Sequence, residues 1–431
     1  MEELTKYKLG EIAKIYNGST PSTLDASNYD GDIIWATPKD LSDQNSKYFS
    51  KGARNITQKG FDSCSTQMIP ANNILMSSRA PIGLFAINTV DCCTNQGFKN
   101  IVLDKAIADV DFMYYFLKYH VKEIEALGSG TTFREVSKTA FEKYEISIPS
   151  LPTQQKIASV LSKLDRKISV NREINRNLEA LAKQIYDYWF VQFDFPNKEG
   201  KPYKSSGGKM VWNDVLKREI PAGWEIKKIS SQIKENIGGD WGKEEPEGNY
   251  QLKVSCCRGA DLVSMTDLPT RYILNSNSYK LLEEDDMIVE ISGGSPTQAT
   301  GRCVLISKEI LNSFNNKLIC SNFCQALSIS DKDYVSYFYY MWKMFYNSDV
   351  FFNFEGKTSG IKNFQYDTFV AEKWYFPPKD LAKKFKEIVS QNYMKKCALD
   401  QENKHLAALR DELLPLLMNG QVTLNSCLSH D

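Results

Sequence analysis

The feature that most constrains the fold of this 431-residue chain is an internal repeat. The segment Gly128–Phe133 aligns with Gly356–Ile361 at an offset of 228 residues. The alignment continues without a gap for roughly 60 positions, and Pro149 falls on Pro377. A repeat of this length indicates a duplicated structural unit, so the sequence predicts two similar halves related by a pseudo-two-fold axis.

Each copy of the repeat ends in a long helical pattern, in which apolar residues alternate at spacings of four and three. Such a pattern, sustained over about four heptads, is typical of a coiled coil. Asn175 and Asn403 occupy the same position of the repeat, and an Asn in an apolar seam fixes register. We therefore predict an antiparallel helix pair, against the alternative of two ordinary amphipathic helices, each packed on its own domain. The predicted seam residues are Ile157, Leu161, Leu164, Ile168, Asn175, Leu178 and Ile185 in the first helix, and Phe385, Ile388, Leu399, Asn403, Leu406, Leu409 and Leu413 in the second.

Proline marks the start of both helices. The first helix is expected to begin after Pro152 and the second after Pro378, with Thr153 and Asp380 as the predicted N-caps. Pro415 is expected to weaken the second helix near its end.

The segments outside the helices read as mixed domains. Short strand-like runs lie between Gly, Pro, Asn and Asp residues, with a helix near Asp111–Ile124 in the first segment and one near Tyr334–Tyr346 in the second. The predicted fold class is therefore α+β, with two mixed α/β domains separated by two long helices that form an antiparallel coiled coil. The segment around Ser205–Gly208 reads as a flexible linker. The predicted boundaries are 1–150 for the first domain, 151–196 for the central spacer helix, 197–214 for the linker, 215–378 for the second domain, 379–424 for the C-terminal spacer helix and 425–431 for a tail.

The charge balance excludes a protein that coats nucleic acid through overall basicity. Lys and Arg number 53, as do Asp and Glu, so the net charge is zero, although a local basic face remains compatible with this balance. The chain contains no apolar run of about 18 residues, so no transmembrane helix is predicted. The start of the chain is too polar for a secretory signal, and the ten cysteines include the adjacent pairs Cys92-Cys93 and Cys256-Cys257. We therefore expect reduced thiols and a cytoplasmic location.

Searches for catalytic motifs find incomplete patterns. Gly356-Lys357-Thr358 has the end of a phosphate loop, but Phe351 stands where its first glycine belongs. Phe376-Pro377-Pro378-Lys379 lacks the asparagine of an amino-methyltransferase motif. Cys320 and Cys324 are spaced like half of a zinc site, but no second pair follows, which favours buried thiols. The sequence predicts neither a catalytic centre nor a metal or cofactor site in this chain.

Several segments resemble the specificity (S) subunits of type I restriction-modification enzymes. The run Pro149–Ile157, Pro-Ser-Leu-Pro-Thr-Gln-Gln-Lys-Ile, precedes the long helix as in that family, and Ile220–Glu225 opens the second half similarly. Gly18–Pro21 and Ala80–Gly83 also fit, whereas Gly238–Gly242 departs from the Gly-x-Thr-Pro of the first half. The resemblance spans nearly the whole chain, and its most specific part is the order domain, helix, domain, helix.

The resemblance implies a non-catalytic DNA-recognition subunit. Each domain is then a target-recognition domain that reads one half of a bipartite double-stranded DNA target, and the coiled coil sets the gap. Two methyltransferase (modification) subunits, which bind S-adenosylmethionine and methylate adenine, are the implied partners, and restriction subunits with translocase and nuclease activity can join. The alternative is a non-catalytic coiled-coil scaffold for protein partners without DNA specificity, which the zero net charge favours.

Candidate DNA contacts follow from the chemistry of recognition. Phosphates are bound by Lys, Arg and small polar donors, and bases are read by forked donors such as Arg, Asn and Gln. The two Gly-rich loops Gly128–Arg134 and Gly356–Asn363, at matched positions of the repeat, are the best candidates. The predicted DNA-binding residues are Lys39, Ser78, Arg79, Gln96, Lys99, Thr131, Thr132 and Arg134 in the first domain, and Arg258, Thr297, Gln298, Arg302, Lys357, Thr358, Lys362 and Asn363 in the second.

Two further groups have open interpretations. Asp40 and Asp261 could accept from cytosine, but a turn-capping role is favoured. The aromatic residues at the end of the first long helix, including Trp189 and Phe190, could face partner subunits or pack under the second domain. The aromatic residues of the two shorter helices are expected to form helix core; they are Tyr114, Tyr115, Phe116 and Tyr337–Tyr340.

Overall fold

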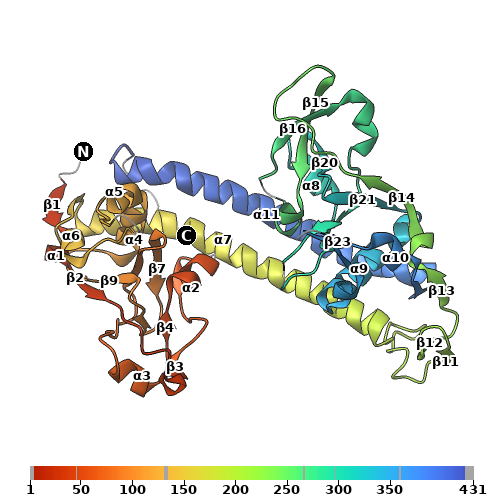
Figure 1. Ribbon diagram of the computed structural model, residues 1–431, viewed down its shortest axis with the longest axis horizontal. Helices are drawn as coiled ribbons and strands as arrows, with labels where there is room; N and C mark the ends of the chain where they lie inside the picture. Colours follow the sequence, from red (N-terminus) through yellow and green to blue (C-terminus); the bar gives the residue numbers. More distant parts are fainter. Residues whose placement is uncertain are drawn as a thin grey trace. The chain divides into compact units, whose positions relative to one another are not determined.

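The computed structural model describes residues 4–44, 46–130, 134–265, 267–295, 297–358 and 361–422, with only the backbone at 357 and 358. The chain divides into two compact units. Unit 1 contains the residues up to 171 together with those from 402 onward, and unit 2 contains residues 172–401. Each unit therefore holds one globular domain and one half of each long helix (Figure 1).

Unit 1 is built on a five-stranded sheet with the strand order β2-β9-β6-β7-β5. Its neighbours are antiparallel except for the short parallel pair β5 and β7. Helix α4 (Val110–Tyr119) covers one face, where Phe112 and Tyr115 are buried against Ile74 and Ile101 of the central strands. The strands are β2 (Ala13–Asn17), β5 (Tyr48–Phe49), β6 (Ile74–Ser78), β7 (Ile82–Asn88) and β9 (Phe98–Leu103); the other elements are β1 (Thr5–Lys8), α1 (Leu9–Ile12), η1 (Ala26–Asn28), β3 (Tyr29–Ile33), β4 (Trp35–Ala36), α2 (Pro38–Asp43), α3 (Gln58–Asp62), β8 (Cys93–Thr94), α5 (Val121–Ala126), α6 (Lys138–Glu142) and β10 (Glu145–Ile148).

Unit 2 repeats the first four strands of this sheet in the order β14-β21-β17-β19. Helix α9 (Val335–Asn347) takes the place of α4, and a second sheet of order β16-β15-β20 is added. The main strands are β14 (Ile233–Gly238), β17 (Met287–Glu290), β19 (Cys303–Leu305) and β21 (Cys324–Ile329), and the added ones are β15 (Tyr250–Cys257), β16 (Thr270–Leu274) and β20 (Lys317–Cys320). The other elements are η2 (Asp187–Val191), β11 (Met210–Asn213), β12 (Arg218–Pro221), β13 (Glu225–Lys228), η3 (Ile229–Gln232), η4 (Gly259–Val263), η5 (Asn275–Lys280), β18 (Ser292–Gly293), α8 (Lys308–Asn312), η6 (Lys332–Tyr334), η7 (Val350–Phe354), β22 (Glu355–Thr358), β23 (Ile361–Phe364), α10 (Tyr366–Ala371) and β24 (Lys373–Phe376).

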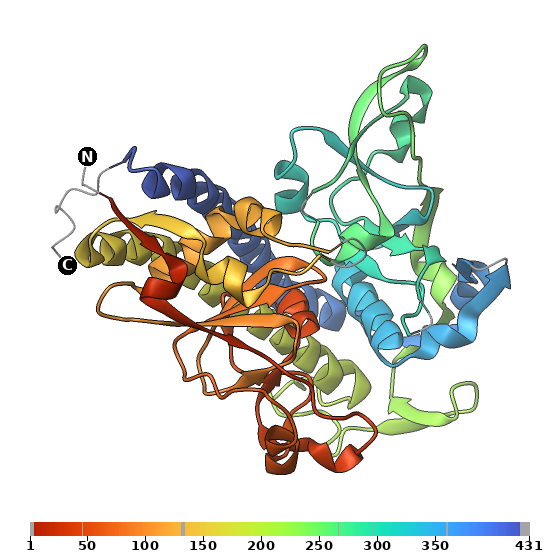
Figure 2. The same ribbon diagram turned by 60° about the vertical axis from the view of Figure 1, so that its left-hand side comes forward.

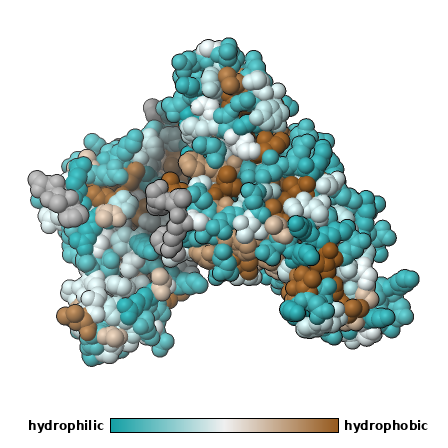
Figure 3. All heavy atoms as spheres, turned by 45° about the vertical axis from the view of Figure 1, so that its right-hand side comes forward, coloured by the Kyte–Doolittle hydropathy of each residue, from teal (hydrophilic) through white to brown (hydrophobic). Residues whose placement is uncertain are grey.

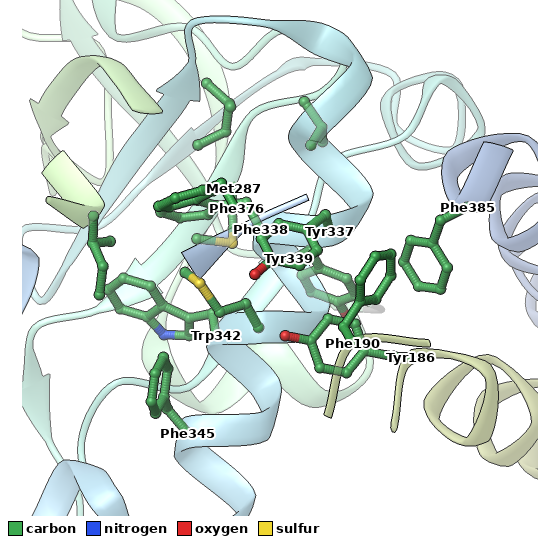
Figure 4. Packing of buried hydrophobic residues seen from close by; sticks show 14 of the residues in the cluster. Tyr186, Phe190, Met287, Tyr337, Phe338, Tyr339, Trp342, Phe345, Phe376 and Phe385 are labelled. Atoms are coloured by element: carbon green, nitrogen blue, oxygen red, sulfur yellow. The ribbon is translucent and has the colours of Figure 1, made fainter. Parts of the chain in front are cut away.

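The core of unit 2 joins the ends of the long helices to the second domain. Tyr186 and Phe190, at the end of the first long helix, point toward Tyr337 of α9 and Phe385 of the second long helix (Figure 4). The ring centroids of Phe190 lie 4.9 Å from Tyr337 and 5.0 Å from Phe385, both edge-on. The aromatic residues that could have faced a partner therefore pack under the second domain; Trp189, Phe190 and Phe193 are at most 8% exposed.

The long helices are α7 (Leu151–Tyr186) and α11 (Lys379–Met418), drawn in yellow and blue in Figures 1 and 2. In unit 1 the side chain of Asn171 donates to Asn403 at 3.1 Å. In unit 2 Asn175 donates to Asp400 at 2.6 Å. In unit 1 Asp165 also pairs with Arg410, and in unit 2 Glu179 pairs with Lys396. Within each unit the partner numbers therefore fall on α11 as they rise on α7, so the helices pair antiparallel in each unit, as the heptad pattern predicts. In each unit the long helices also pack on the globular domain, because Leu161 of α7 belongs to the core of unit 1 and Phe385 of α11 to the core of unit 2.

The helix starts differ from the prediction. The two helices begin at Leu151 and Lys379, so Thr153 and Asp380 lie inside the first turn and are not the N-caps. The Pro-Thr-Gln run instead anchors α7 to the first domain through Gln154, which is 1% exposed. Its Oε1 accepts from the backbone of Asp109 at 2.9 Å, and its Nε2 donates to two backbone carbonyls. A fully paired buried amide of this kind fixes the angle at which the helix leaves the domain.

Two other boundaries also change. Helix α11 continues through Pro415 to Met418. The segment expected to be a flexible linker is folded, because the backbone of Ser205 donates to Asp194 at 2.7 Å and Tyr203 stacks on Phe195 with ring centroids 4.6 Å apart.

The seam residues differ in burial. Ile388 is 41% exposed while Val389 beside it is 1% exposed, so Val389 takes the inward position predicted for Ile388. The spacing of four from Phe385 to Val389, in place of three, explains the change. Ile157, Leu161, Ile168, Asn175 and Phe385 are buried, and the half-buried seam residues are Leu164, Leu178, Ile185, Leu399, Asn403, Leu406, Leu409 and Leu413.

Candidate nucleic-acid interface

In unit 1 the polar loop that starts at Gly128 lies beside the end of strand β6. The backbone of Val136 donates to the carbonyl of Ser78 at 3.1 Å, and Ser78 donates to Gly97 at 2.7 Å. Ser129 and Glu135 exchange two backbone hydrogen bonds of 3.0 and 3.1 Å and close the loop as a hairpin. Three chain segments therefore meet at one end of the sheet. The predicted contacts Thr131 and Thr132 lie outside the described residues.

Glu135 is the centre of the charges at this sheet end. Its carboxylate accepts from Lys99 Nζ at 3.0 Å and from Ser78 Oγ at 3.3 Å, and lies 3.8 Å from Arg79 Nη1. Lys99 is 5% exposed, whereas the side chains of Arg79 and Glu135 are each 37% exposed. The sequence analysis selected both cations and Ser78 and missed the carboxylate that holds them together.

The other candidates of unit 1 stand around this centre and are exposed. Gln96 precedes Gly97 and accepts a hydrogen bond from the Thr20 hydroxyl. Lys39 lies in the first turn of α2, whose Pro38 packs near Gly97. Arg134 Nη2 lies 3.4 Å from the Gly128 carbonyl, to which it donates. The first domain therefore gathers its predicted contacts at a single sheet end.

The loop of unit 2 occupies the same place in its sheet. Strands β22 and β23 form the hairpin, and β23 pairs with β18. The backbone of Phe364 donates to the carbonyl of Ile291 at 2.9 Å, which repeats the bond from Val136 to Ser78, and the two donors lie at the offset of 228 residues. The side chains of Lys357 and Thr358 lie outside the described residues. The matched position predicted for the two loops is thus a matched position in the fold.

The cations of unit 2 are held by carboxylates from other elements. Arg302 donates two hydrogen bonds, of 2.9 and 2.5 Å, to Glu290, whose side chain is 2% exposed, and this bond raises the pKa of the guanidinium. Lys362 pairs with Glu355 at 2.8 Å. Each pair leaves the cation partly exposed, at 17% for Arg302 and 21% for Lys362. The carboxylates therefore orient these donors.

The remaining candidates of unit 2 are exposed or lie in the hairpin. Arg258 makes a forked pair with Asp261 at 2.8 and 2.9 Å. Thr297 and Gln298 are exposed in the turn that the backbones of Ser295 and Gln298 close. Asn363 Oδ1 accepts from the Ser292 hydroxyl at 2.7 Å.

An open cavity of about 750 Å³ lies beside the hairpin of unit 2. Polar side chains line much of it, including Asn236, Asn322, Gln325, Asn363 and Gln365. Of these, the sequence analysis selected only Asn363. Asn236, Asn322 and Gln325 lie outside the gapless stretch of the repeat, so the repeat does not align them, whereas Gln365 lies inside it and was not among the predicted contacts.

The open interpretations are settled by hydrogen bonds and burial. Asp40 accepts from the backbone of Thr37 at 2.7 Å, and Asp261 from that of Arg258 at 2.9 Å, which confirms their turn-capping role. The aromatic residues predicted as helix core, Tyr114, Tyr115, Phe116 and Tyr337–Tyr340, lie in the cores, and among them only Tyr340 is half-buried. Cys324 is buried, which raises the pKa of its thiol to about 12.

Comparisons with known proteins match this architecture. The family model described as the type I restriction modification DNA specificity domain matches residues 1–180. The chain is 30% identical over 433 residues to the specificity subunit of the type I restriction enzyme MjaIX of Methanocaldococcus jannaschii, covering 96% of this chain and 92% of that relative. It is 29% identical over 203 residues to the EcoR124I/EcoR124II specificity subunit of Escherichia coli, covering 44% and 48%. The solved S subunit of a type I restriction-modification system from M. genitalium superposes with a TM-score of 0.57 at 18% identity, over 96% of each chain.

The fold and these likenesses define a protein that recognises DNA sequence. The chain belongs to the family of type I restriction enzyme specificity subunits. The resemblance inferred from the sequence motifs is confirmed, and the scaffold alternative is not favoured. Over the described residues, none of the helices is long and apolar enough to cross a membrane.

Proposed function

We propose that this chain reads a split DNA target, with the domain of unit 1 contacting one half and the domain of unit 2 the other half. The observation that carries the proposal is the repeated bond between hairpin and core strand, from Val136 to Ser78 and from Phe364 to Ile291. Both hairpins present polar and charged side chains at the same sheet end. Two recognition domains that share a fold but carry different side chains fit a DNA target whose two halves differ in sequence.

The paired helices would act as the spacer between the halves. An α-helix rises 1.5 Å per residue, so its length converts directly into distance along DNA. Polar bonds across the pair support a fixed register, because Asn171 is fully buried and donates to Glu402 at 2.7 Å as well as to Asn403. Sliding one helix against the other would break these bonds and leave buried amides unpaired.

The chemistry of modification would come from partner subunits. We propose two methyltransferase subunits that bind S-adenosylmethionine and methylate adenine, with restriction subunits as further partners. Exposed apolar side chains support protein partners: Val211, Trp212 and Val215 around strand β11 are 47, 56 and 55% exposed. Figure 3 shows hydrophobic residues in patches among hydrophilic ones on one face.

The mode of DNA contact follows from the ion pairs. Lys39 and Arg134 are exposed and supply phosphate contacts, whereas Arg79, Arg258, Arg302 and Lys362 are pre-oriented by carboxylates for more directional contacts. A guanidinium held by a carboxylate loses less conformational freedom when it binds a base edge.

The decisive experiment is to produce the chain with its methyltransferase subunit in a host without other adenine methylation, and to map every methylated adenine. The expected result is one asymmetric motif of two defined halves separated by undefined bases. A contiguous motif, or methylation that does not depend on this chain, contradicts the proposal. The scaffold alternative predicts that the assembled complex binds specific and unrelated DNA equally.

A further inference from the structure

The register of the two sheets makes Lys99 and Gln325 equivalent residues. In unit 1 Lys99 of β9 lies opposite Asn17 of β2 and Met76 of β6. In unit 2 Gln325 of β21 lies opposite Gly238 of β14 and Val289 of β17. In each unit the corresponding hairpin lies beyond this residue. Its backbone bond is accepted by Ser78, two positions after Met76, in unit 1, and by Ile291, two positions after Val289, in unit 2. The side chains of Lys99 and Gln325 are both buried, at 5% and 7% exposure.

The hairpin supplies the second member of each pair. Glu135 precedes Val136, and Asn363 precedes Phe364, so the two residues match at the offset of the repeat. In unit 1 the pair is ionic, with Lys99 Nζ 3.0 Å from Glu135 Oε1. In unit 2 it consists of two amides, since Gln325 and Asn363 both line the open cavity of about 750 Å³. The same two positions of the fold therefore carry different side-chain chemistry in the two domains.

The Gln325 amide is incompletely satisfied. Gln325 Nε2 is buried and has no hydrogen-bond partner among the described residues. A buried amide donor without a partner is unfavourable, and such groups in native structures are usually completed by water or a ligand. Asn363 uses its Oδ1 for the Ser292 hydroxyl. The cavity also exposes Phe323, whose side chain is uncharged and 47% exposed.

These groups fit one ligand chemistry. The amide of Gln or Asn pairs with the N6 and N7 atoms of adenine, and an apolar side chain contacts the thymine methyl group. In contrast, Lys donates to guanine and a carboxylate accepts from the cytosine amino group, which suits G·C pairs.

We propose that the cavity of unit 2 takes the edge of an A·T base pair, with Gln325 and Asn363 as the residues that specify it. The inference rests on the proposed function and names the place where the second domain reads sequence. The equivalent pair in the first domain, Lys99 and Glu135, gives that domain a different preference at the same position of its fold.

The test compares methylated motifs from complexes that carry variants of this chain. Gln325→Met keeps the size of the side chain and removes its hydrogen bonds. It is expected to relax one A·T position in a single half of the motif, with a loss of discrimination of about 5- to 100-fold, and to leave the other half unchanged. Gln251→Met is the matched control, because Gln251 lies on β15 and donates to the Gly248 carbonyl, away from the cavity residues.

Exchanging the residue pair of the second domain for that of the first is a stronger test than removing the Gln325 hydrogen bonds. Gln325→Lys combined with Asn363→Glu installs the pair of the first domain and is expected to shift the relaxed position toward G·C. Where either variant assembles poorly, Gln325→Glu keeps the shape and replaces the amide donor with an acceptor that is negatively charged when ionised. Binding to oligonucleotides substituted at each position then replaces motif mapping. A motif unchanged at every position in Gln325→Met and Gln325→Glu overturns the inference, as does relaxation spread over both halves. Absence of any split motif with the unaltered chain counts against the proposed function instead.

Discussion

Arg410 of α11 donates from Nη1 to Asp165 Oδ1 of α7 at 2.7 Å, and both side chains are largely buried, at 22% and 18% exposure. The other oxygen of Asp165 accepts from the Tyr115 hydroxyl of α4. Lys47, whose side chain is 4% exposed, donates to Ser162 of α7 at 2.9 Å and pairs with Asp111 at 2.5 Å. Within unit 1, this network ties the sheet domain to both long helices, so the reader and the spacer cannot reorient separately.

Asp165→Asn should destabilise the protein by about 2 kcal/mol, because it removes one of the two carboxylates that hold the partly buried guanidinium of Arg410, the other being Asp411. Thermal unfolding of the assembled protein, followed by circular dichroism, measures the loss. The matched control is Lys167→Met, since Lys167 pairs with Glu402 at 3.4 Å while its side chain is 50% exposed. An exposed pair of this kind contributes at most about 1 kcal/mol. Equal effects of the two substitutions would show that burial of the network is unimportant.

The start of α11 gives unit 2 a pH-dependent contact. Lys379 Nζ lies 2.7 Å from Asp331, and its hydrogen bond holds the pKa of that carboxyl below the usual 3.8. A lowered pKa in the folded state stabilises the protein above pH 3.8, and the contribution disappears as the pH falls through the lower, folded value. Lys379→Met should therefore reduce stability slightly at pH 6 and make no difference at a pH below both values. Denaturation curves at several pH values test this, and a difference that grows on acidification would contradict it.

The helices and their pairing could be predicted from the sequence because a heptad pattern is local and repeats many times. The same holds for the matched hairpins, since the repeat has no gap from Gly128 onward and from Gly356 onward. The failure at Ile388 shows the limit of such patterns, because a single change of spacing moved the inward position to Val389. The N-caps failed for a similar reason, as each helix begins one or two residues before the residue predicted to cap it.

The acidic half of the site could not be predicted. Glu135 is distant in sequence from Lys99 and Arg79, and a selection of contacts by donor type passes over Glu135, Glu290 and Glu355 because an ionised carboxylate donates no hydrogen bond. Gln325 was missed because the offset between the halves is not constant: it is 228 residues at the hairpins but 226 between Lys99 and Gln325, so only strand register shows that these two residues correspond. Residue type is enough to select the side chains that donate hydrogen bonds to DNA, but the carboxylates that hold these side chains depend on the tertiary structure.

Arg134→Gln should weaken the binding of target DNA by the assembled complex without affecting assembly. Arg134 is exposed, and among the described residues its side chain makes one long hydrogen bond, of 3.4 Å to the Gly128 carbonyl, so its loss costs little stability. Loss of one phosphate contact should lower affinity by several-fold and reduce the slope of log K against log salt by about one. Titrations at four salt concentrations measure both quantities. Lys138→Gln is the control, because Lys138 is exposed in α6 and pairs with Glu142 at 3.6 Å. The same affinity and slope in the Arg134 variant would remove the hairpin from the interface.

Lengthening both long helices by seven residues should widen the gap between the two halves of the target. A heptad preserves the seam pattern, so the added residues can continue the pairing on both helices. Seven residues add about 10.5 Å at 1.5 Å per residue, which corresponds to roughly three base pairs at 3.4 Å each. The insertions belong next to Asn171 in α7 and Asn403 in α11, which contact each other at 3.1 Å and therefore mark one level of the pair. Mapping methylated adenines gives the gap directly, and insertion in α7 alone serves as the control because it puts the seam residues beyond it out of step with their partners. An unchanged gap in the doubly extended protein would mean that the helices do not set the spacing.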